Sequence, residues 1–389
     1  MDRADPEEGD GDDGDPHVLN DGSAPGGTGG AADRLHAGRG RAGPGSGPAG
    51  AQPHLGQLHR RVPCWLLAVP ATCQQGNCPA LRLRKTTDGG RRWSRVPAPP
   101  TVASVRFSRP PAGSVAHVAF ADASDGWAYG PGLWSTHDGG RTWRRVPTHG
   151  ESVQSLVTAG GRVLASFSRC GPAQLPSCAG FGVYSSPAAR DDWQPVPGAA
   201  SRQYGYGLVA AAGTRGFVTA STGVAGRRDL LLAGPVNGSA PWRPRPVPCL
   251  NWVNWAMPVA ATPGGTVLLG CASQPGAGQQ AKVAYLSRDG GRCWRRLADP
   301  PASGYLGALS VTPAGTIAAS GTRSDVYLSW DSGRTWHTSR SLDRADIGDG
   351  LFATMVTDTT GFVLQNNNSL TQIWFTRDDG RTWAPVTVH

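Results

Sequence analysis

The stretch TRDDGRTW, residues 376–383, decides the fold of this chain, because four close relatives of it come earlier. A short Asp side chain accepts hydrogen bonds from backbone N–H groups two or three residues on. Gly adopts the positive φ that other residues resist, and the final Trp adds a large apolar ring. Each copy therefore predicts a tight hairpin turn. The four relatives are TTDGGRRW (86–93), STHDGGRTW (135–143), SRDGGRCW (287–294) and SWDSGRTW (329–336).

The spacing of these turns predicts the number of structural units. Two decayed copies, SPAARDDW (186–193) and PVNGSAPW (235–242), fill the long gap between Trp143 and Trp294. The seven unit-ending tryptophans are then 42–52 residues apart, at Trp93, Trp143, Trp193, Trp242, Trp294, Trp336 and Trp383. Each unit also carries an earlier apolar segment: CWLLAV (64–69), GWAYG (126–130), GRVLASF (161–167), GFVTA (216–220), GTVLLG (265–270), GTIAAS (315–320) and GFVLQ (361–365). A repeat of this length with several short strands is typical of propeller blades.

We therefore predict an all-β fold, a seven-bladed β-propeller of four-stranded antiparallel blades over residues 61–389. The last blade completes its own outer strand after Trp383. Closure should then come from packing of the first blade on the seventh, without strand exchange. The first blade is the weakest, because its inner strand should lie near 52–60, where AQPHLGQLH has little strand character.

Residues 1–60 have a different composition and are predicted to form a disordered tail. They begin with the acidic run DPEEGDGDDGD and continue rich in Gly, Ala and Pro. Such a segment buries too little apolar surface to offset its ordering entropy. It also lacks the basic start and apolar core of a signal peptide. A misassigned gene start or a frameshift is the alternative, since a one-nucleotide shift permits Val-Ser-Phe-Thr at 56–59.

The turn motif resembles the Asp-box, or BNR repeat, of the sialidase-type β-propellers. Their boxes lie on the periphery, so the resemblance implies structural roles for the matching residues. These residues are Asp88, Gly90, Trp93, Asp138, Gly140, Trp143, Asp289, Gly291, Trp294, Asp331, Gly333, Trp336, Asp378, Gly380 and Trp383. The chain also resembles Asp-box propellers of the photosystem II assembly-factor type. That likeness implies a non-catalytic exported protein that binds a protein or a glycan.

Catalysis of the sialidase kind needs residues that this chain lacks. The resemblance would require a Tyr nucleophile activated by Glu, yet the only glutamates are Glu7, Glu8 and Glu151, two of them in the predicted tail. We therefore predict no catalytic residue, cofactor or metal. The expected function is an exported module that binds a protein or glycan at its central face or assists assembly. The alternative is a glycoside hydrolase, either sialidase-like or with two aspartates.

The formal charge of +9 comes almost entirely from Arg, because Lys85 and Lys282 are the only lysines. A nucleic-acid binder would gather Arg and aromatics on one face. Here the arginines recur beside the predicted turns, which spreads them around the rim. No apolar run approaches the roughly 18–20 residues that cross a bilayer. We expect a monomer that binds no nucleic acid and has no membrane span. The bias toward Arg, Ala, Gly and Pro indicates a high-GC bacterium.

The eight cysteines indicate disulfides more than metal. Cys73/Cys78 and Cys170/Cys178 each bracket a short loop, and Cys249/Cys271 is a plausible pair within one blade. A zinc site would need four convergent ligands, whereas these pairs fall in different blades. Disulfides imply an oxidising compartment, hence an extracellular or cell-envelope location. Spacing assigns no partner to the remaining two, Cys64 and Cys293.

Overall fold

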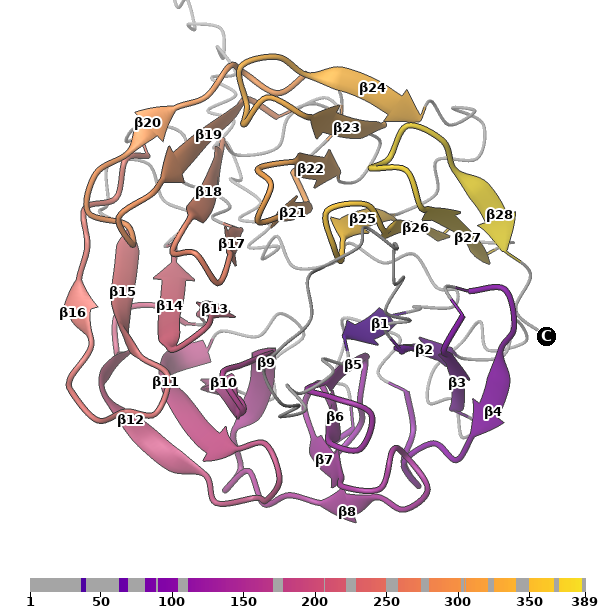
Figure 1. Cartoon of the computed structure of the whole chain (residues 1–389). Coiled ribbons are helices and arrows are strands. Elements are labelled where there is room, and N and C mark those ends of the chain that lie inside the picture. The colour runs from indigo at the N-terminus through magenta and orange to yellow at the C-terminus, as the bar shows by residue number, and fades with distance from the viewer. Residues whose placement is uncertain are drawn as a thin grey trace, which may run out of the picture.

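The protein is a ring of seven blades (Figure 1). Each blade is a four-stranded antiparallel sheet, and the described residues contain strands and turns but no helix. This confirms the predicted seven-bladed propeller. The computed structural model describes residues 36–39, 63–68, 81–88, 90–103, 111–170, 178–205, 207–221, 229–249, 258–273, 280–301, 304, 306–320, 325–340, 350–366 and 371–386.

Every blade uses four strands that follow one another in the chain, with the first innermost and the fourth outermost (Figure 1). Blades 1 to 3 contain β1 (His36–Arg39), β2 (Cys64–Ala68), β3 (Arg82–Thr86), β4 (Ser94–Val96); β5 (His117–Phe120), β6 (Gly126–Tyr129), β7 (Leu133–Thr136), β8 (Arg144–Arg145); β9 (Ser152–Ala159), β10 (Arg162–Cys170), β11 (Cys178–Pro187), β12 (Gln194–Ser201). Blades 4 and 5 contain β13 (Leu208–Ala212), β14 (Arg215–Ala220), β15 (Leu230–Pro235), β16 (Arg243–Pro244); β17 (Val259–Ala261), β18 (Val267–Ala272), β19 (Lys282–Ser287), β20 (Arg295–Arg296). Blades 6 and 7 contain β21 (Ala308–Val311), β22 (Ile317–Ser320), β23 (Val326–Ser329), β24 (His337–Arg340); β25 (Gly350–Met355), β26 (Gly361–Asn366), β27 (Thr371–Thr376), β28 (Ala384–Val386).

The two decayed repeats form ordinary blades of the ring. In blade 3 the turn between β11 and β12 carries Trp193, and in blade 4 the turn between β15 and β16 carries Trp242. Both turns keep a polar side chain that bonds to backbone, although neither has the Asp of the intact copies. Ser186 Oγ accepts from the Asp192 N–H, and Asn237 Oδ1 accepts from the Ser239 N–H.

Blade 1 takes its inner strand from a part of the chain where no strand was predicted. β1 pairs antiparallel with β2, with His36 opposite Leu67 and Arg39 opposite Cys64. The strand expected near 52–60 is thus supplied by His36–Arg39, within the segment predicted as a tail, and 52–60 lies outside the described residues. The division into a tail at 1–60 and a propeller from 61 otherwise stays a prediction.

The core lies between neighbouring blades. Trp65 of β2 stacks on Phe120 of β5, with ring centroids 3.8 Å apart and planes 3° from parallel, and both side chains are fully buried. In blade 5 the strands β18 and β19 are buried along their whole length. Strands packed between two other blades in this way are mostly apolar on both faces, with Lys282 and Ser287 as the buried polar ends of β19. Each large apolar side chain contributes about 1.5–3 kcal/mol on full burial.

The ring closes by side-chain packing between blades 7 and 1. Leu66 of β2 belongs to one buried cluster with Phe362, Leu364 and Phe375 of blade 7. The Phe375 ring edge lies 2.8 Å from the point where Gly90 would carry a Cβ, so only glycine fits there. Since all four strands of each of these blades come from one continuous stretch, closure occurs without strand exchange.

Candidate functional site

The turn between the third and fourth strands of a blade, here called the box turn, is organised around its Asp. In blade 6, Asp331 Oδ1 accepts from the backbone N–H groups of Arg334 (2.9 Å) and Thr335 (3.0 Å). Its Oδ2 accepts from the Thr335 hydroxyl at 2.6 Å, and its Oδ1 also accepts from Ser329 Oγ at 2.8 Å. The donors therefore lie three and four residues on, one residue further than predicted.

All five intact box turns use this arrangement. The carboxylates of Asp88, Asp138, Asp289 and Asp378 each accept from the backbone N–H four residues on. These bonds stabilise the charged form and hold the pKa of each carboxyl below its usual range, that of Asp138 at about 2, chiefly through the Thr142 hydroxyl. The box glycines have φ of 77° to 93°, as predicted. The carboxylates of the box aspartates are thus used in hydrogen bonds that hold the turn together.

Replacing Asp138 with alanine is expected to lower the free energy of unfolding by about 1–2 kcal/mol, because the Thr142 N–H and hydroxyl lose their acceptor. The folded pKa lies below the unfolded one, so this contribution is present above about pH 4 and is lost as pH falls through about 2. Urea unfolding at pH 7 and pH 3 measures both effects. Asp299→Ala, which removes an exposed ion pair with Arg296, is the control and should change stability by less than about 0.5 kcal/mol. Equal losses for the two variants would contradict the prediction.

The box tryptophans connect blades. The indole N–H groups of Trp143, Trp294 and Trp336 donate to backbone carbonyls of the preceding blade, each at 2.9 Å. Trp383 donates to Ser339 Oγ of the preceding blade at 2.7 Å, and Trp93 donates within its own turn. The rings also lie against their own turns, since the Trp294 and Trp383 rings are each 3.5 Å from the point where the box glycine, Gly291 or Gly380, would carry a Cβ. In four of the five copies the tryptophan thus also joins neighbouring blades, an arrangement here called the clasp.

Two predicted disulfides are present. Cys170 is bonded to Cys178, and Cys249 to Cys271. Cys73 and Cys78 lie outside the described residues. Cys64 is buried in β2, whereas the exposed thiol of Cys293 donates to Asp289 at the position where three other boxes carry Thr, and this raises the pKa of the thiol. Across the described ranges, no His, Cys, Asp or Glu side chains form a group of three that could hold a metal ion.

Glu151, the one glutamate of the predicted propeller, lies near a tyrosine. Its Oε1 is paired with Arg169 Nε at 3.1 Å. Burial, and then the charge of Glu151, raise the pKa of Tyr184. A tyrosine nucleophile must lose its proton easily, so the environment of Tyr184 opposes that role.

A histidine bridges two aspartates at the junction of blades 2 and 3. His137 Nδ1 lies 2.8 Å from Asp125 Oδ1, and its Nε2 lies 3.4 Å from Asp191 Oδ2. Asp191 Oδ2 also accepts from Ser135 Oγ at 2.5 Å. No spacing in the sequence indicated this bridge. A two-carboxylate glycosidase holds the scissile bond between its acids, and here the imidazole occupies that space.

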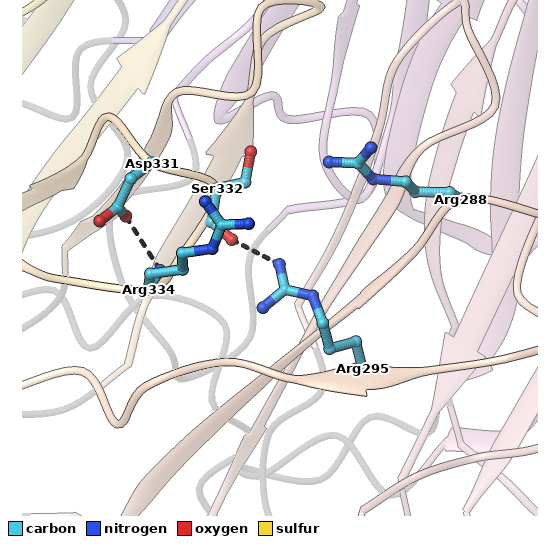
Figure 2. Close-up of a pocket in the computed structure, with 5 residues that line it drawn as sticks. All are labelled: Arg288, Arg295, Asp331, Ser332 and Arg334. Atoms are coloured by element: carbon cyan, nitrogen blue, oxygen red, sulfur yellow. Dashed lines mark hydrogen bonds between the residues drawn. The ribbon is translucent and has the colours of Figure 1, made fainter.

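A pocket of about 280 Å³ lies at the rim between blades 5 and 6. Antiparallel strands place the box turn and the turn between the first two strands at the same end of each blade, and the pocket lies at this end. Arg288 follows β19, Arg295 lies on the outermost strand β20, and Ser332 and Arg334 belong to the box turn of blade 6. Figure 2 shows the three guanidinium groups directed toward the same space, with Asp331 to the left of Arg334. We call this set of five residues the rim pocket.

The rim pocket is strongly basic. Arg295 Nη2 donates to the Ser332 carbonyl at 2.7 Å, which fixes this guanidinium across the blade boundary. Asp331 is the one carboxylate among the lining residues, and its oxygens are already bonded inside the box turn. In the described part of the chain, neither Arg288 nor Arg334 is within ion-pair distance of a carboxylate. The side chains can therefore accept an anionic group from outside.

The rim pocket lies on the outer half of the blades, around β20 (Figure 1), and not at the central face. The ligand expected at the central face stays a prediction. The arginines beside the turns can be recognised in the sequence, but their meeting across a blade boundary cannot. The described residues also include no helix with the length and hydropathy to cross a bilayer.

No family model and no curated protein matches the chain. Among solved structures, it is similar to YCF48 from Cyanidioschyzon merolae, with 14% identity, 83% of this chain and 94% of that chain covered, and a TM-score of 0.50. It is also similar to YCF48 bound to D1 peptide, with 16% identity, 72% and 82% covered, and a TM-score of 0.47. A Trypanosoma rangeli sialidase in complex with the inhibitor DANA matches with 13% identity, 64% and 50% covered, and a TM-score of 0.41. At these identities the likeness concerns the fold, which does not decide between binding and hydrolysis.

Proposed function

We propose that this chain is an exported, non-catalytic propeller of the Asp-box type that binds an anionic group of a protein or glycan partner in the rim pocket. The charge of the pocket is the observation that carries the proposal. Arg288, Arg295 and Arg334 meet a single carboxylate whose hydrogen-bonding capacity is already used. Guanidinium groups bind carboxylate, sulfate and phosphate through paired N–H donors, so an acidic partner fits.

Export is part of the proposal. The disulfides Cys170–Cys178 and Cys249–Cys271 are typical of proteins that fold in an oxidising compartment. A location outside the cell or in the cell envelope suits a module that captures an extracellular partner. We propose that it acts there as a monomer, without cofactor and without binding nucleic acid.

The binding proposal is tested with a fluorescein-labelled peptide of the sequence Gly-Glu-Glu-Glu-Gly, followed by fluorescence anisotropy. Arg334→Met should weaken binding tenfold or more, because a charge-assisted hydrogen bond contributes about 1.5–3 kcal/mol. Arg141→Met, at the same box position in blade 2 but outside the pocket, is the matched control and should have no effect. Binding should also weaken as salt rises from 0.05 to 0.5 M. Equal weakening by both variants would mean unspecific charge attraction and would sink the proposal.

We expect no hydrolysis of a fluorogenic sialoside above a heat-inactivated control. A glycosidase needs a nucleophile and a proton donor on either side of the bond. Glu151 is ion-paired, Tyr184 has a raised pKa, and a ring separates Asp125 from Asp191. Turnover that survives Glu151→Ala and is lost in Asp125→Asn would establish the glycoside hydrolase instead.

A further inference from the structure

A second group of arginines lies at the junction of blades 4 and 5, on the other side of the blade 5 box turn. Arg215 begins β14, Arg245 follows β16, and Arg292 belongs to the box turn. Arg215 Nη1 lies 2.8 Å from the point where Gly290 would carry a Cβ. Gly290 has φ of 73°, so glycine both permits the turn and leaves room for the guanidinium. The start of β14, the segment after β16 and the box turn of blade 5 therefore each contribute one guanidinium group to this cluster.

The charge of this cluster is not balanced within the described residues. Burial, and then the positive charges of Arg292 and Arg215, lower the pKa of Arg245, while Asp289 acts in the opposite direction. Asp289 is committed to its own turn, where it accepts from Ser287 Oγ and from the Arg292 and Cys293 N–H groups. Three guanidinium groups and one carboxylate leave a local charge of about +2.

Arg245 also has an unused donor. Its Nε is buried and has no hydrogen-bond partner among the described residues, although the side chain as a whole is half-buried. A buried charged donor without an acceptor costs about 1–3 kcal/mol or more. The three guanidinium groups repel one another, and one buried N–H among them has no acceptor. Both features are expected of an anion-binding site without its ligand.

We propose that Arg215, Arg245 and Arg292 form a phosphate-binding site at the junction of blades 4 and 5. A phosphate monoester carries about −1.5 to −2 charge at pH 7 and three strong acceptor oxygens. That charge balances the cluster, and the oxygens can satisfy Arg245 Nε together with its neighbours. A carboxylate, with one charge and two oxygens, would leave the cluster partly unbalanced. The site does not depend on what occupies the rim pocket.

The test uses two capped peptides, Gly-Gly-pSer-Gly-Gly and its unphosphorylated form, titrated calorimetrically into the full chain. The phosphopeptide should bind saturably and the plain peptide should not. Affinity should rise between pH 5.5 and pH 7.5, because the second phosphate pKa is near 6. Arg245→Met should weaken binding tenfold or more. The exposed Arg292→Met is a second variant with the same expected direction, in case the half-buried position does not tolerate Met.

Arg334→Met separates this site from the rim pocket. It should leave phosphopeptide affinity within about twofold, whereas Arg245→Met should leave binding of the Glu-rich peptide unchanged. Phosphopeptide binding that is lost in Arg334→Met and kept in Arg245→Met and Arg292→Met would assign the phosphate to the rim pocket and overturn the inference. Absence of saturable phosphopeptide binding would overturn it as well, and the Glu-rich peptide result would still stand on its own.

Discussion

Replacing Phe375 with alanine is expected to lower the free energy of unfolding by about 3–5 kcal/mol, as for other large aromatic residues in protein cores. Phe375 is 2% exposed and lies where the ring closes. Its ring is 6.2 Å from that of Trp93 in blade 1 and 6.1 Å from that of Phe362 in blade 7, measured between centroids. Alanine would leave a cavity at the one junction whose two blades are not consecutive in the chain.

Urea unfolding measures the loss, and hydrogen exchange shows where it acts. Phe217→Ala, at a buried position of the second strand of blade 4, is the matched control and should cost a similar free energy. Only Phe375→Ala should speed exchange in β2 and β27 beyond that of the other blades, because the junction between them opens first. Uniform exchange in both variants would show that the closing junction is no weaker than the rest.

Removing the Cys249–Cys271 disulfide is expected to lower the free energy of unfolding by about 3 kcal/mol. The bond joins residues 22 apart in sequence and so restricts the unfolded chain more than Cys170–Cys178, which joins residues 8 apart. The double variants Cys249→Ala/Cys271→Ala and Cys170→Ala/Cys178→Ala, compared by urea unfolding, should follow that order. Since Cys271 is fully buried, some loss of packing adds to the first.

Cys293→Ser is the control for these variants. Cys293 is exposed and outside any disulfide, and serine can keep the hydrogen bond to Asp289. Its stability should stay within about 0.5 kcal/mol of the parent chain. A loss near zero for Cys249→Ala/Cys271→Ala would mean that the unfolded chain is not restricted in the way the loop length implies.

The box turns made the fold predictable because their constraints are local. Asp331 bonds to backbone N–H groups three and four residues on, and Gly333 supplies a positive φ, so both residues shape the turn from within it. Even the decayed copy at 186–193 could be found, because its Ser and Trp keep their spacing. The strand His36–Arg39 could not be found, since HAGR has no apolar alternation and its order comes from pairing with β2.

The sites could not be predicted because they join residues that are far apart in sequence. Arg295 and Arg334 meet across a blade boundary, and their separation in sequence gives no hint of it. The same holds for His137, which bridges Asp125 of its own blade and Asp191 of the next. Glu151 is a third case, since its position in the chain gave no reason to place it near Tyr184.

The clasp formed by the box tryptophans gives the assembly of the ring a direction. Trp143 donates to the Pro97 carbonyl and Trp336 to the Ala298 carbonyl, and in both cases the acceptor is synthesised before the donor. The preceding blade, which each new blade packs against, is therefore already synthesised, and blades can be added in the order of synthesis. Trp93 of blade 1 differs, because its aromatic neighbour Phe375 belongs to blade 7, which is synthesised last. Protease protection of stalled nascent chains should then extend blade by blade from the N-terminal side, and protection that appears only with the complete chain would contradict this order.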